Sequence, residues 1–80
     1  MMTDLEQQII DLVVDISGDD EAAEDLDMDL FEEDILDSIA AIELLVALKD
    51  EFGVSIAPTE LEREEMNTVN KIIERVRERM

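Results

Sequence analysis

The chain has 80 residues, of which 24 are acidic and six are basic, so its formal net charge is −18 at pH 7. This charge disfavours nucleic acid and anionic membrane surfaces as partners, and the lack of histidine and cysteine excludes thiol catalysis, disulfides, Cys/His zinc sites and a histidine general base. We expect one domain over residues 1–80 that does not insert into a membrane and resides in the cytoplasm, because a membrane span needs about 20 apolar residues and no run approaches that length.

The first helix is predicted to follow Thr3, which has the spacing of a capping box with Glu6. Apolar side chains recur at helical spacing after it. Ser17-Gly18 is expected to end this helix, because glycine readily adopts the backbone conformation found beyond a helix C-terminus. The apolar stripe consists of Leu5, Ile9, Leu12, Val13 and Ile16.

Residues 19–37 are predicted to form a long loop, since this stretch is rich in carboxylates and has no basic residue. A loop of this length in a small domain is uncommon and is usually functional or partly disordered. We expect four apolar side chains within it to contact the core, namely Leu26, Met28, Leu30 and Phe31.

Three aspartates of this loop, Asp25, Asp27 and Asp29, have the 1-3-5 spacing of a calcium-binding EF-hand. An EF-hand loop also needs glycine at position 6 and glutamate at position 12. Leu30 and Leu36 occupy those two positions here. The sequence therefore predicts no specific metal site, while weak binding of divalent cations to the acidic loop stays open.

The second long helix is predicted to begin after Asp37, a good N-cap residue, and to run to about Phe52, with Gly53 as its C-terminal stop. Most of its apolar side chains spread over a wide arc, which predicts a largely buried helix. That arc comprises Ile42, Leu44, Leu45, Leu48 and Phe52. The narrow remaining face comprises Ala40, Glu43, Ala47, Asp50 and Glu51, with Ile39 and Val46 at its border.

The last third of the chain predicts a short extended segment at residues 54–56 and a short helix or turn around residues 60–65, where Thr59 and Glu62 have capping-box spacing. Asn67 or Thr68 is expected to cap the last helix. The apolar stripe of that helix is Val69, Ile72, Ile73 and Val76, and its basic residues are Lys71, Arg75, Arg77 and Arg79. Together the elements predict an all-α fold, a small four-helix bundle with three longer helices, one short helix and a long first loop.

Ser38 lies where the acidic loop meets the second long helix. Without a histidine in the chain or a G-x-S-x-G motif around it, this serine is not a conventional nucleophile. A group attached to it would lie beside free backbone N–H groups and the positive end of the helix dipole, which favour a phosphodiester. The residues alone leave two interpretations open, an attachment site and an ordinary first-turn serine.

The segment LDSIAAIELLVALKDEFGV resembles the phosphopantetheine attachment region of acyl and peptidyl carrier proteins. In that family an Asp-Ser pair opens the second helix, an acidic residue five places after the serine begins a Glu-Leu run, and the helix ends in an acidic-Phe-Gly step. The corresponding residues are Asp37-Ser38, Glu43-Leu44-Leu45 and Asp50-Glu51-Phe52-Gly53.

This resemblance implies a carrier rather than an enzyme. It implies that a separate phosphopantetheinyl transferase attaches 4′-phosphopantetheine from coenzyme A covalently to Ser38, flanked by Asp37, and that cargo is held on this arm as a thioester. It also implies a contact surface for partner enzymes, with two apolar and two acidic side chains on the second helix. Those four residues, which an ordinary helix surface explains as well, are Ile39, Glu43, Val46 and Asp50.

Residues 31–38, FEEDILDS, and residues 59–72, TELEREEMNTVNKI, are similar to the D-alanyl carrier branch of this family, which holds D-alanine for esterification of teichoic acids. Met66 and Val69 stand where that branch leads us to expect Trp and Pro. The branch implies a monomer whose partners are the transferase, an ATP-dependent D-alanine ligase and a membrane acyltransferase. Two alternatives remain: a fatty-acyl, polyketide or peptidyl carrier, and an acidic helical adaptor or ion-binding module that is never modified.

Overall fold

Four α-helices and one 3-10 helix make up the regular structure of the residues that the computed structural model describes, 4–57 and 62–80. In chain order they are α1 (Asp4–Ser17), α2 (Glu21–Glu24), α3 (Ser38–Phe52), η1 (Arg63–Glu65) and α4 (Val69–Arg79). These described residues include no β-strand, and none of their helices has the length and hydrophobicity that crossing a bilayer requires. The predicted all-α bundle of three longer helices and one short one is confirmed.

The structure has two short elements, α2 and η1, and the sequence predicted only the second. Helix α2 interrupts the predicted 19–37 loop, where the Asp19 carboxylate accepts a hydrogen bond of 2.9 Å from the backbone N–H of Glu21 and Ala22 is fully buried. Within the described residues 62–65, the single 3-10 turn of η1 agrees with the short helix or turn predicted around residues 60–65. Two residues of the predicted capping boxes, Thr3 and Thr59, lie outside the described residues.

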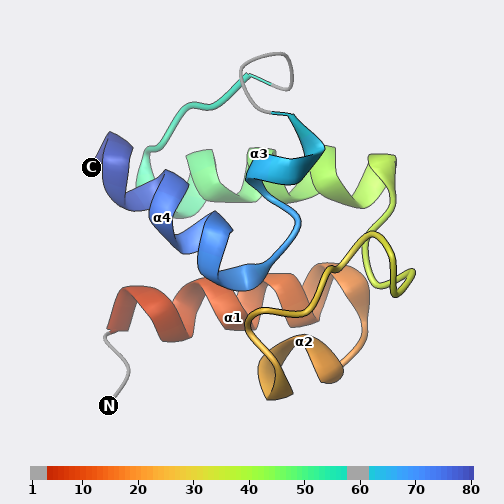
Figure 1. Cartoon of the computed structure of the whole chain (residues 1–80). Coiled ribbons are helices and arrows are strands. Elements are labelled where there is room, and N and C mark those ends of the chain that lie inside the picture. The colour runs from red at the N-terminus through yellow and green to blue at the C-terminus, as the bar shows by residue number, and fades with distance from the viewer. Residues whose placement is uncertain (1–3, 58–61) are drawn as a thin grey trace.

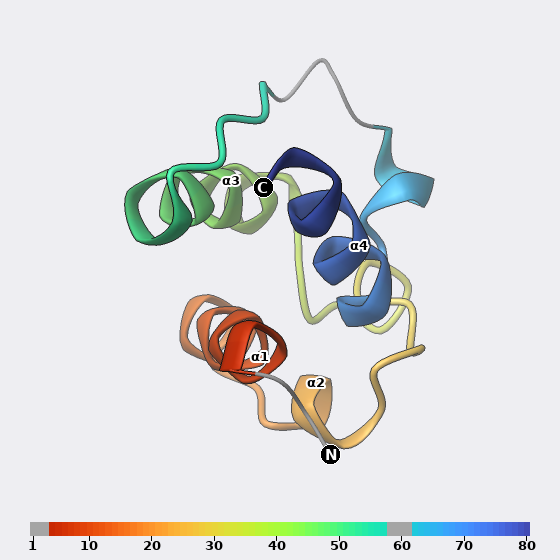
Figure 2. The ribbon, with the colours of Figure 1, turned by 90° about the vertical axis from the view of Figure 1, so that its left-hand side faces the viewer.

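The three long helices surround one apolar core. Helix α1 packs against α2, α3 and α4, and it runs in the opposite direction to α3 (Figure 1). A view along the bundle shows α1, α3 and α4 at three corners, with α2 beside α1 (Figure 2). The first residues of α3 lie at the end of the bundle opposite the C-terminus (Figure 1). The start of α3, where Ser38 lies, is therefore at one end of the bundle, next to the acidic loop that precedes it.

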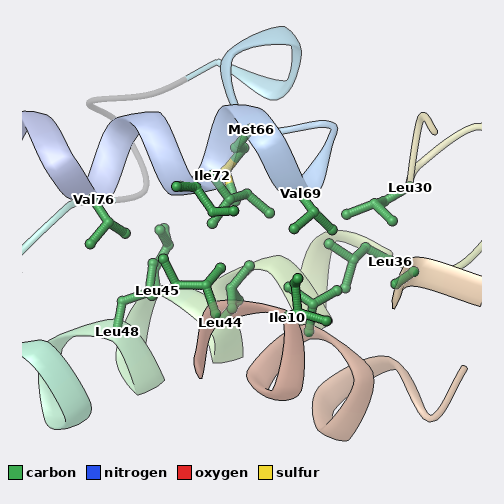
Figure 3. Close-up of a cluster of buried hydrophobic side chains, with 14 of the residues drawn as sticks. Ile10, Leu30, Leu36, Leu44, Leu45, Leu48, Met66, Val69, Ile72 and Val76 are labelled. Carbon is green, nitrogen blue, oxygen red and sulfur yellow. The ribbon is translucent and has the colours of Figure 1, made fainter. Parts of the chain in front are cut away.

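The core is made of aliphatic side chains, as the scarcity of aromatic residues requires. Side chains from α1, α3, α4 and the loop point toward one another in the centre of the bundle (Figure 3). The three apolar stripes predicted from spacing supply most of them. The largest fully buried side chains are Ile9, Val13, Leu30, Leu44, Leu48, Val69, Ile72 and Val76.

The ends of the helices follow the predicted signals. Gly18 and Gly53 adopt the left-handed conformation, with φ of 72° and 68°, and their N–H groups donate to the carbonyls of Val14 and Lys49. Such a conformation is strained for residues that carry a Cβ atom, which explains glycine at both stops. Of the two candidate caps for α4, Thr68 is the one used, because its hydroxyl accepts a hydrogen bond of 3.1 Å from the N–H of Lys71.

Replacing Leu48 by alanine should remove about 2–5 kcal/mol from the free energy of unfolding, because the side chain is almost completely buried and leaves a cavity. This is a large share of the about 5–15 kcal/mol typical of a small domain. Ile39→Ala on the same helix is the matched control and should change stability by less than about 0.5 kcal/mol, since Ile39 is exposed. Urea titrations followed by circular dichroism measure both, and equal losses would contradict this packing.

Candidate functional site

Ser38 is the first residue of α3, and its neighbour Asp37 holds the helix start in place. Asp37 has an extended backbone, and its carboxylate accepts a hydrogen bond of 2.7 Å from the N–H of Ala40. Its carbonyl accepts a further bond of 2.9 Å from the N–H of Ala41. The predicted N-cap is therefore confirmed, and the serine side chain is left out of the cap.

The surroundings of Ser38 suit a phosphodiester. Its side chain is exposed, and among the described residues the N–H groups of Ser38 and Ile39 have no hydrogen-bond acceptor. The first N–H groups of a helix carry the positive end of the helix dipole, which attracts anions. This serine hydroxyl can thus carry a phosphate-linked group without displacing a core side chain or an internal hydrogen bond.

The loop before Ser38 is anchored at Leu30, whose side chain is fully buried. The N–H of Leu30 donates to the carbonyl of Asn67 at 2.7 Å, just before α4. Its carbonyl accepts from the N–H groups of Ile35 and Leu36 at 2.9 and 3.0 Å, and both of those side chains are buried. The residues that lead into Asp37 are thereby tied to the core, which fixes the position of the helix start.

Two Asp–Asn pairs join the same loop to the start of α4. The side-chain amide of Asn67 donates to Asp29 at 2.9 Å, and that of Asn70 donates to Asp27 at 2.7 Å. The backbone N–H of Asn70 also donates to the carbonyl of Leu26 at 3.1 Å. We call these contacts the loop clasp. It connects two segments that are far apart in the sequence.

The aspartates with EF-hand spacing are thus used as hydrogen-bond acceptors within the fold. Asp25 accepts from the backbone N–H of Asp27, and Asp29 accepts from the N–H groups of Phe31 and Glu32, each at 3.0 Å. Within the part of the chain that the structure describes, no three acidic side chains are grouped so as to hold a metal ion.

The pKa of Asp29 is lowered from its ordinary value of 3.8, chiefly by the hydrogen bond from the Glu32 N–H. Partial burial opposes this change, whereas the Asn67 amide, the Phe31 N–H and the nearby positive charge of Lys71 add to it. Each favourable contact is stronger with the ionised carboxylate, so the ionised form of Asp29 stabilises the conformation of the loop.

The outward face of α3 is more apolar than the sequence predicted. Ile39 and Val46 are 71% and 56% exposed, as expected for border residues. Ile42 was predicted to be buried but is 49% exposed, because α3 contacts the core through a narrow strip formed by Leu44, Leu45 and Leu48. The face also carries three exposed charged side chains, so we define the exposed face of α3 as Ile39, Ile42, Glu43, Val46, Lys49 and Asp50.

The structure places the predicted site residues in two groups. Asp37 and Ser38 form the start of α3, while Ile39, Glu43, Val46 and Asp50 lie along its exposed face. Sequence reasoning missed Ile42 and Lys49 as members of that face. Their spacing from Ile39 and Val46 placed them nearby, but only the packing of α3 shows which edge of the apolar arc faces outward.

Comparison with known proteins connects this geometry to one family. Residues 7–76 match the profile of the family described as "Phosphopantetheine attachment site". The chain is 55% identical over 75 residues to the D-alanyl carrier protein of Lactococcus lactis subsp. cremoris, covering 94% of this chain and 95% of that protein. It is 36% identical over 75 residues to the D-alanyl carrier protein of Bacillus velezensis, covering 94% and 96%.

Asp29→Ala should lower the melting temperature at neutral pH, because the variant loses the carboxylate that binds Asn67 and two backbone N–H groups. Since the folded pKa is below the unfolded one, this contribution is fully present above about pH 3.8 and is lost as the pH falls through the lowered value. Melting curves of both proteins over a pH series should therefore converge in acid. Glu33→Ala in the same loop controls for the change in net charge, and a gap that persists at the lowest pH would contradict this account.

Proposed function

This chain belongs to the phosphopantetheine attachment-site family of carrier proteins, and we propose that the Ser38 hydroxyl is the point at which the arm is attached. The cofactor of the family is covalently bound 4′-phosphopantetheine, which supplies a terminal thiol for holding cargo as a thioester. Carriers of this family are generally not catalysts. The family match therefore favours a modified carrier over an adaptor that is never modified.

The observation that carries the proposal is the position of the Asp37–Ser38 pair. It opens α3, it lies within the matched residues 7–76, and the serine side chain is exposed while the aspartate caps the helix. The free N–H groups at the helix start favour an anionic phosphodiester there.

Attachment requires a separate phosphopantetheinyl transferase, because the chain has no histidine or cysteine to act on Ser38. In this step the Ser38 oxygen forms a bond to the phosphorus of coenzyme A that carries the pantetheine arm. The bond from that phosphorus to the nucleotide part breaks, and the hydroxyl proton passes to a base of the transferase. The role of this chain is to present the hydroxyl on a fixed helix start.

Partner enzymes are proposed to dock on the exposed face of α3. Ile39 and Val46 provide apolar contact area, and the carboxylates of Glu43 and Asp50 lie beside them to meet basic residues. A basic partner surface is also steered toward a chain with a net charge of −18. Exposed aliphatic side chains next to the attachment serine are the feature that supports this assignment.

D-alanine is the proposed cargo, on the strength of relatives named D-alanyl carrier protein that are 36–55% identical over most of the chain. The size of one space in the core agrees with a small polar cargo. The space between Leu45, Leu48 and Met66 that the described residues enclose is only about 10 Å³, about enough for a single water molecule. A fatty chain needs far more room, because each CH₂ group left in water costs about 0.8 kcal/mol.

The two departures from the D-alanyl branch lie in the core. Met66 and Val69 are both buried, so they alter internal packing and leave the exposed face of α3 unchanged.

The proposed partners are an ATP-dependent D-alanine ligase, which loads the carrier in the cytoplasm, and a membrane acyltransferase, which receives the cargo for teichoic acid. The carrier is proposed to act as a monomer.

Ser38→Ala should abolish modification while leaving the helical spectrum unchanged. The experiment incubates the protein with coenzyme A and a phosphopantetheinyl transferase and then measures the intact mass. Wild-type protein should gain the mass of one phosphopantetheine group, and so should Ser55→Ala, which removes another exposed serine. A mass gain that persists in Ser38→Ala would refute the assignment of this site.

Loading of the modified protein tests the cargo. A D-alanine ligase supplied with D-alanine and ATP should yield a D-alanyl thioester, which hydroxylamine cleaves. In parallel, an acyl carrier synthetase supplied with a medium-chain fatty acid should load the protein poorly, because the space between Leu45, Leu48 and Met66 is too small for the chain. Efficient fatty loading without D-alanyl loading would overturn the cargo while leaving the carrier function intact.

A further inference from the structure

Lys49 distinguishes one side of the exposed face of α3 from the other. It is exposed, and among the described residues its ammonium has no ion pair or hydrogen bond. In contrast, α4 residues bind their neighbours: Lys71 donates to the carbonyl of Glu64 at 3.0 Å, Arg77 pairs with Glu6 at 3.0 Å, and Arg75 pairs with Glu78 at 2.9 Å. The position of Lys49 in the last turn of α3 stabilises the helix through the helix dipole. The Lys49 ammonium nevertheless remains available to a partner.

A hollow of about 200 Å³ adjoins this lysine. One wall is formed by Ile42, Leu45, Val46 and Lys49 of α3, and the other by residues 55–57. The lining is mainly aliphatic, with one lysine and one serine, and it is continuous with the apolar side chains of the exposed face. A concave, mostly apolar surface of this size accommodates one large apolar side chain.

The charges on the face are arranged asymmetrically. Helical geometry puts Glu43 and Asp50 on one side of the line through Ile39 and Val46, and it puts Lys49 with Ile42 on the other. A partner docked in the reverse orientation would bring like charges together, which is costly. The pattern therefore selects both the partner and its direction along α3.

We propose that the hollow beside Lys49 receives an apolar side chain of a partner enzyme, and that a carboxylate next to that side chain binds Lys49. This inference rests on the proposed function, since it specifies the partner surface that fits the carrier. Along the helix, the lining of the hollow extends from Ile42, about 6 Å from Ser38, to Lys49, about 16 Å from it, at 1.5 Å per residue. It is thus a second point of contact, farther along α3 than the attachment serine, that sets the angle at which the partner meets the arm.

The cargo itself is a poor occupant of this hollow. A D-alanyl group carries an ammonium, which gains nothing from an aliphatic lining and is repelled by Lys49. The hollow consequently stays open for the partner protein while the carrier is loaded.

The test compares Lys49→Glu, Lys49→Gln and Lys49→Arg in loading by the D-alanine ligase and in modification by the transferase. In at least one reaction Lys49→Glu should raise the KM for the carrier about threefold to fivefold with kcat unchanged, as expected for loss of an exposed ion pair. Lys49→Gln should have a smaller effect, Lys49→Arg almost none, and the difference should shrink at high salt. Arg79→Glu in the last turn of α4 changes the net charge equally and is the matched control, with melting curves verifying that each variant is folded.

The outcomes separate this proposal from the carrier function. If wild-type protein takes up no arm and no cargo, the proposed function is wrong. If wild-type protein is modified and loaded but Lys49→Glu has an unchanged KM in both reactions, Lys49 serves only the helix end and the inference is wrong. A lower KM for Lys49→Glu would also overturn it, because the partner would then present a cation there. An equal rise in Arg79→Glu would assign the effect to net charge and likewise overturn it.

Discussion

The position of Ser38 at the start of α3 depends on the main chain at Leu30. Its N–H and carbonyl bind Asn67, Ile35 and Leu36, and its side chain is fully buried. A long acidic loop would otherwise move freely, since its carboxylates repel one another and contribute no core. Because three backbone hydrogen bonds meet at this one buried residue, the chain enters α3 at a defined place and direction. The loop clasp adds side-chain bonds around the same junction.

Local signals made most of the fold predictable from the sequence. The caps at Asp37 and Thr68, the stop at Gly53 and the apolar stripe of α4 depend on residues a few positions apart, and the structure confirms each of them. The resemblance around Asp37-Ser38 added the family, which the comparisons confirm. The attachment itself remains a proposal that the exposed helix start supports.

The features that the sequence did not predict depend on tertiary contacts. The loop clasp joins Asp29 to Asn67 and Asp27 to Asn70, and no local spacing encodes pairs so far apart. Helix α2 is four residues long, too short for a periodic pattern, and its burial at Ala22 comes from packing on α1. Ile42 and Lys49 join the exposed face of α3 for the same reason, because the orientation of an apolar arc is decided by what packs against it.

Asp37 caps α3 and Ser38 does not, which has a consequence for the proposed attachment of the arm. Serine is itself a favoured N-cap residue, and esterifying a capping hydroxyl would put a bulky, acceptor-only phosphate where the helix needs a compact acceptor. Here the carboxylate of Asp37 satisfies the Ala40 N–H, and Ser38 sits one position inside the helix. Attachment of the proposed arm to Ser38 would therefore leave the Asp37 cap in place. The cap of α3 is complete in the unmodified chain, so this helix start does not depend on the proposed arm.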